Sequence, residues 1–126
     1  MVQYNPAELL QVGPLNVPVS LQPAARPMLV LPVGAIVRLV VRLVVQAKRA
    51  GLPVSLLEIK AAVDPELESW REVVVRVSLM CTPEVGLQAW EELSERLETL
   101  RSGLDTFQKE LMDESVAFQV VWPEVR

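Results

Sequence analysis

Residues 82–111 read TPEVGLQAWEELSERLETLRSGLDTFQKEL and decide the fold more than any other part of the chain. Large apolar side chains recur in this segment every three or four residues, which is the spacing of one face of an amphipathic helix. The stripe consists of Trp90, Leu93, Leu97, Leu100, Leu104, Phe107 and Leu111. The segment therefore predicts a helical region with one face to bury and a glutamate-rich face for water.

The ends of this helical region are also marked in the sequence. Thr82 is a good N-cap, and Pro83 suits the first helical position because its missing N–H group is not needed there. Gly103 is expected to interrupt the region, and Asp105 can cap a second, short helix. The seven-residue repeat therefore need not indicate a coiled coil.

Three segments around the helical region alternate apolar and polar residues, which is typical of half-buried strands. They are Val54–Val63, Trp70–Met80 and Ser115–Trp122. The connection between the first two, Asp64–Ser69, is short, acidic and rich in turn residues, so it predicts a hairpin.

The segment between Gly34 and Gly51 fits two patterns. Alternation would place Arg38 and Arg42 on one face of a strand, whereas a helix gathers Arg38, Arg42, Gln46 and Arg49 into one narrow polar stripe. The helix is preferred because it explains the polar residues up to the end of the segment, where basic residues precede a capping glycine. We therefore expect a helix from Ala35 to Ala50 that is buried on more than one side.

Residues 1–27 differ in character from the rest of the chain, because they contain five of its ten prolines. This density excludes a long helix or a central strand. The segment is expected to be an extended arm, for which two interpretations stay open. It is either a poorly ordered or surface-packed arm, or an arm that binds a partner, which its apolar residues favour because they exceed those of a disordered tail. Met28–Leu31 is a short apolar run that predicts the first strand.

The resulting order of strand, helix, strand, strand, helix, strand predicts an α+β fold, namely a ferredoxin-like two-layer sandwich. If Met28–Leu31 does not form a strand, a three-stranded α+β layer remains. The expected organisation is an arm over residues 1–27 followed by a single domain over residues 28–126.

Composition argues against most kinds of catalysis. The chain has no histidine, its five glycines form no phosphate-binding loop, and its lone cysteine, Cys81, has no histidine to act as its base. The acidic turn residues Asp64, Glu66 and Glu68 lack the spacing of a calcium loop. We therefore predict no enzymatic activity, no metal site and no cofactor.

Charge and hydropathy limit the partners. A net charge of −4 disfavours nucleic acid, which attracts basic surfaces. Met28–Val45 is long and apolar, but Arg38 and Arg42 near its middle disfavour a membrane span. The chain opens with no recognisable secretion signal and has a single cysteine, so a cytoplasmic location is expected.

The leading functional prediction is a non-catalytic interaction protein that self-associates or serves as an accessory or regulatory subunit. A specific form of this prediction is an antitoxin-like protein. Its basis is the hydrophobic content of 51%, which exceeds what a small core usually hides. The alternative is a regulatory domain that binds a small ligand at a subunit interface. The residues predicted to contact a partner are Leu15, Val17, Val19, Arg38, Arg42, Arg49 and Trp70.

Overall fold

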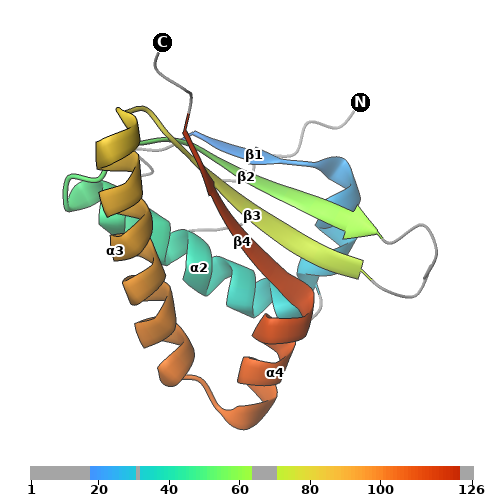
Figure 1. Cartoon of the computed structure of the whole chain (residues 1–126). Helices are drawn as coiled ribbons and strands as arrows, with labels where there is room; N and C mark the ends of the chain where they lie inside the picture. The colour runs from blue at the N-terminus through green and yellow to red at the C-terminus, as the bar shows by residue number, and fades with distance from the viewer. Residues whose placement is uncertain (1–17, 31, 64–70, 123–126) are drawn as a thin grey trace.

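The fold is an α+β arrangement in which helices lie against one face of a four-stranded sheet (Figure 1). The computed structural model describes residues 18–30, 32–63 and 71–122. Its elements, in chain order, are β1 (Val19–Leu21), the 3₁₀ helix η1 (Pro23–Val30), α2 (Pro32–Arg49), β2 (Val54–Val63), β3 (Arg71–Leu79), α3 (Pro83–Ser102), α4 (Thr106–Ser115) and β4 (Val116–Val121). The predicted α+β class and the order of strands and helices are confirmed.

The sheet order, however, is not ferredoxin-like. The strands follow one another as β1-β2-β3-β4, with β1 parallel to β2, β2 antiparallel to β3, and β3 parallel to β4. Each crossover therefore joins two neighbouring strands, whereas a ferredoxin-like sheet places another strand between them. The two longest strands, β2 and β3, pair as a hairpin and take the centre, which leaves the shorter β1 and β4 at the edges.

The prediction of a first strand at Met28–Leu31 is wrong for the part of it that the structure describes, because Met28 and Leu29 belong to η1. Short apolar runs do not distinguish a buried strand from a buried helical turn, and Pro27 cannot donate to a sheet ladder. Burial of Ala25, Met28 and Leu29 explains why the run is apolar. The first strand is instead β1, within the residues assigned to the arm.

Helix α2 confirms the helical interpretation of Ala35–Ala50. Ten of its residues are buried, and they are Val33, Gly34, Ile36, Val37, Val40, Val41, Leu43, Val44, Val45 and Ala47. The helix is followed by Gly51, whose φ of 107° favours glycine. Because α2 packs against η1, α3, α4 and the sheet, its apolar surface is covered within the chain.

The helix-facing side of the sheet supplies the other half of the core. Leu57 and Ile59 on β2, together with Val75 and Val77 on β3, are fully buried. The opposite face alternates with them and is more polar, as the pair Glu58 and Arg76 illustrates. The core thus lies between the sheet and α2.

Helices α3 and α4 begin as the sequence predicts. The Thr82 hydroxyl accepts a hydrogen bond from the Val85 N–H group (3.4 Å), and Pro83 opens α3. Asp105 and Gln108 form a reciprocal capping box at the start of α4, with distances of 2.8 Å and 3.1 Å. The predicted interruption at Gly103 is therefore confirmed.

The apolar stripe of this helical region is only partly buried. Leu93 is fully buried, whereas Trp90 is 47% exposed and Phe107 is 62% exposed. The prediction that Trp90 is a core residue is therefore wrong. Trp122 is half-buried, and its ring lies against Gly86, where an added Cβ would come within 2.7 Å of it. Helix α3 contacts mainly α2 and α4 rather than the sheet, which leaves one flank of α3 uncovered.

Candidate functional site

The outer edge of β4 is the first component of the candidate site. Among the described residues, β4 is the last strand of the sheet and pairs only with β3. Its sequence, Val116–Val121, contains no charged residue and no proline. Proteins usually protect an exposed edge with charges, prolines, bulges or very short strands, because its free N–H and C=O groups can pair with another chain. The six-residue edge of β4 has none of the sequence features of such protection.

A groove beside this edge is the second component. It has a volume of about 390 Å³ and lies between β4 on one side and α3 on the other, with α4 at one end. Figure 1 shows β4 as the front strand of the sheet, with α3 beside it. The groove is lined by the apolar residues Val40, Trp90, Leu97, Met112, Val116 and Phe118 and by the polar residues Ser94, Glu98, Arg101 and Asp113.

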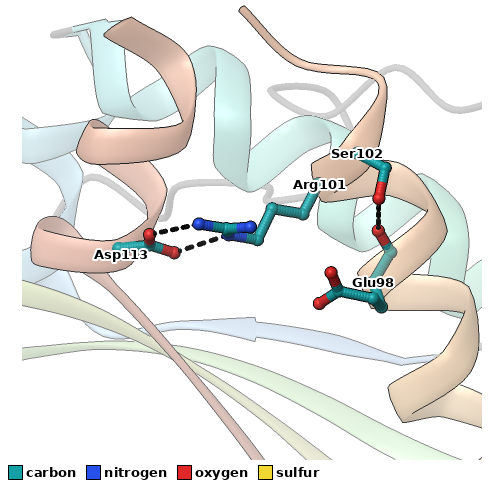
Figure 2. Close-up of polar contacts among 4 residues, drawn as sticks. All are labelled: Glu98, Arg101, Ser102 and Asp113. Carbon is teal, nitrogen blue, oxygen red and sulfur yellow. Dashed lines mark hydrogen bonds and ion pairs between the residues drawn. The ribbon is translucent and has the colours of Figure 1, made fainter. Parts of the chain in front are cut away.

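An ion pair joins α3 to α4 where these helices line the groove. The Arg101 guanidinium donates two hydrogen bonds to the Asp113 carboxylate, from Nε to Oδ1 (2.9 Å) and from Nη2 to Oδ2 (2.7 Å) (Figure 2). This bidentate geometry fixes the orientation of both side chains. The hydrogen bond from Arg101 lowers the pKa of Asp113, and burial opposes this shift in part. The pair links the end of α3 to α4 where both helices line the groove.

We expect the Asp113 carboxyl to titrate below its ordinary pKa of 3.8. Because the folded-state pKa is the lower one, the stabilisation is present above pH 3.8 and is lost as the pH falls through the folded pKa. A carboxyl NMR titration measures this directly, and Arg101→Gln should bring the pKa back toward 3.8. Arg96→Gln is the control, because Arg96 pairs with Glu92 instead. An equal upward shift in both variants would contradict the assigned cause.

Acidic side chains lie along α3, on one side of the groove. Glu98 lines it, and Figure 2 shows its carboxylate on the same helix as Arg101 while its backbone carbonyl accepts a hydrogen bond from Ser102 (2.8 Å). Glu84 and Glu91 precede Glu98 at intervals of seven residues, so the three form one line along α3. All three are exposed. The wall opposite β4 is therefore an apolar surface bordered by negative charge.

The residues predicted from the sequence to bind a partner do not come together at this groove. Val19 lies half-buried in β1, at the opposite edge of the sheet. Arg38, Arg42 and Arg49 are exposed on α2, as the predicted polar stripe requires. Leu15, Val17 and Trp70 lie outside the described residues.

One of the predicted arginines does line a second groove, between α2 and α3. This groove has a volume of about 570 Å³ and contains Arg42, with Leu39 and Leu43 beside it. Glu92 and Arg96 on its other side form an ion pair of 3.1 Å. Its lining comes from α2 and α3 alone, with no residue from a strand, so we place the candidate site at β4.

Both aromatic residues that line the β4 groove belong to segments whose apolar faces the sequence predicts to be buried. Trp90 and Phe118 lie on the apolar faces of α3 and β4, and periodicity identifies such faces without showing how fully they are covered. The available signal was the neutral sequence of the last strand, which is unusual for an edge. That signal becomes informative only when the sheet order is known.

The described part of the chain contains no group of three or more Cys, Asp or Glu residues that could hold a metal ion. The acidic turn residues Asp64, Glu66 and Glu68 fall outside it. No single described helix is long and apolar enough to span a membrane; η1 and α2 together reach that length and composition, but they are bent by 111°.

No family model matches the chain, and neither a characterised protein nor a solved structure is significantly similar to it.

Proposed function

We propose that this protein is a non-catalytic interaction module that binds an extended segment of another protein by adding it as a fifth strand beside β4. The observation that carries the proposal is the position of the β4 edge, which no described strand pairs, next to the groove. In strand addition, main-chain hydrogen bonds to the edge supply affinity, and pockets for alternate side chains supply specificity. The groove between β4 and α3 offers such pockets beside the edge.

The lining of the groove supports a peptide as its occupant. In an added strand, every second side chain points toward the helix side of the sheet. Trp90 and Phe118 would meet these side chains, because both line the groove and Trp90 is half-exposed. Exposed aromatic residues in a groove are typical anchors of protein interfaces.

The proposal predicts that the full-length protein selects alternating segments from a displayed library of random ten-residue peptides. We expect apolar residues at every second position of the selected peptides. Trp90→Ala should weaken binding of a selected peptide at least tenfold, which corresponds to about 1.4 kcal/mol. Phe107→Ala is the matched control, because Phe107 is also an exposed aromatic residue but does not line the groove.

Backbone methylation of the selected peptide separates strand addition from other modes of binding. Alternate N–H groups of a strand point to opposite sides, so only one set can donate to β4. Methylating that set should abolish binding, and methylating the other set should leave most of it. If both sets tolerate methylation, the segment is not an added strand and the proposal is wrong.

A small ligand is the second candidate occupant, because the groove volume of about 390 Å³ lies within the range of ligand pockets. A thermal-shift screen against metabolites tests this alternative, since a ligand that binds only the folded state raises the melting temperature. A hit whose effect is lost in Trp90→Ala would favour it over strand addition.

A further inference from the structure

We propose that the segment bound beside β4 is cationic, with lysine or arginine residues between its apolar positions. This inference rests on the proposed function and names the chemistry of the partner. It depends on how charge is distributed over the fold rather than on the net charge of the chain.

The charge is divided unequally along the chain. Residues 83–121, which form α3, α4 and β4, contain nine acidic and three basic residues and carry a formal charge of −6. The whole chain carries −4, so the remaining residues are positive by 2. Nine of the ten residues that line the groove belong to this negative region, and the tenth, Val40, lies on α2.

The net charge of the side chains that line the groove is negative as well. Its charged lining residues are Glu98, Arg101 and Asp113, so two negative charges face one positive charge. Arg101 donates its hydrogen bonds to Asp113 and is also attracted by Glu98, which leaves the lining with a net charge of −1. Glu84 and Glu91 extend this charge along the exposed side of α3. Strand β4 contributes no charge. A cationic segment thus meets complementary charge along the helix wall.

A second copy of this chain fits the groove less well than a cationic segment. Pairing β4 with its own copy would bring two α3–α4 regions of charge −6 toward each other, and like charges across an interface oppose association. The neutral strand edge permits self-pairing, but the surrounding glutamates act against it. A cationic partner removes this repulsion and gains attraction in its place.

The test compares three eight-residue peptides in which valine alternates with lysine, serine or glutamate. Calorimetric titration with the full-length protein at low salt should rank affinity as lysine, then serine, then glutamate. The advantage of the lysine peptide over the serine peptide should shrink as salt is raised, because exposed charges are screened.

Matched charge reversals on α3 locate the effect. Glu98→Lys should weaken binding of the lysine peptide by about three- to tenfold and leave the serine peptide unchanged. Glu95→Lys makes the same change in net charge on the same helix, but Glu95 lines the groove between α2 and α3. It should therefore have a smaller effect on the lysine peptide.

The possible results separate the inference from the proposed function. Equal affinity for the lysine and serine peptides, with both lost in Trp90→Ala, would overturn the inference and retain strand addition. If the library yields no binding peptide and none of the three designed peptides binds, the proposed function itself is overturned. A concentration-dependent dimer in sedimentation velocity that dissociates on adding a selected peptide would identify a second copy as the occupant and also overturn the inference.

Discussion

Gly34→Ala should destabilise the protein by about 1–3 kcal/mol and lower its melting temperature by roughly 5–10 °C. Gly34 is buried near the start of α2, where the backbone of η1 passes against it. An added Cβ would lie against the Leu29 carbonyl oxygen, closer than Cβ atoms approach other atoms in proteins. Because this neighbour is backbone, it cannot rotate away, and η1 would have to move.

The sign of this prediction is informative because alanine is the better helix former. In a helix interior, replacing glycine by alanine usually stabilises by roughly 0.5–1 kcal/mol. The clash at Gly34 must therefore exceed that gain. Gly103→Ala is the matched control, since Gly103 has an ordinary right-handed conformation and its added Cβ would meet only the Leu100 carbonyl oxygen at 3.6 Å. A chemical denaturation series should show Gly103→Ala neutral or stabilising; equal losses in both variants would contradict the packing of η1.

The junction of η1 and α2 is also a place where the sequence predicts burial but not the backbone conformation. The start of α3 at Pro83 and the cap at Asp105 follow from local chemistry, because a capping side chain contacts backbone within three residues. Met28 and Leu29 are buried by contacts with a different part of the fold. Their apolar character predicts burial but not backbone conformation, so a 3₁₀ helix and a strand were equally compatible with it.

Sheet order was unpredictable for a related reason. The order of strands and helices along the chain is the same in a ferredoxin-like sheet and in the observed one. Only the pairing distinguishes them, as in Leu57, which lies between Val19 on β1 and Val77 on β3. Pairing depends on contacts between distant parts of the chain that leave no periodic pattern in either strand.

The candidate site was not predictable for the same reason, because it depends on which strand lies at the edge of the sheet. The sequence identified Trp90 as apolar and placed it on the correct helix, but assigned it to the core because the whole stripe was assumed to be covered. Whether α3 is covered depends on which strand is outermost and how far the helix stands from it. The exposed arginines of α2 were predictable, since four polar residues at helical spacing can share only one face.

The second large effect is expected at Leu93, which holds α3 to the rest of the molecule. It is fully buried, and only Gly86 and Ala89 are also buried on this helix. Leu93→Ala should cost about 2–5 kcal/mol, from lost transfer energy and from the cavity left behind. Denaturant titration measures the loss, and hydrogen exchange should show that the amides of α3 lose more protection than those of β2 and β3.

Leu87→Ala is the matched control, because it deletes the same atoms from the same helix at a side chain that is 50% exposed. It should cost less than about 1 kcal/mol. Similar losses at Leu87 and Leu93 would show that α3 is buried on both flanks, which would close the groove and remove the basis for strand addition. A large loss at Leu93 alone would mean that one row of side chains supports α3, leaving Trp90 and its neighbours available for a partner. The stability of this helix and the accessibility of the β4 groove are therefore two consequences of the same packing.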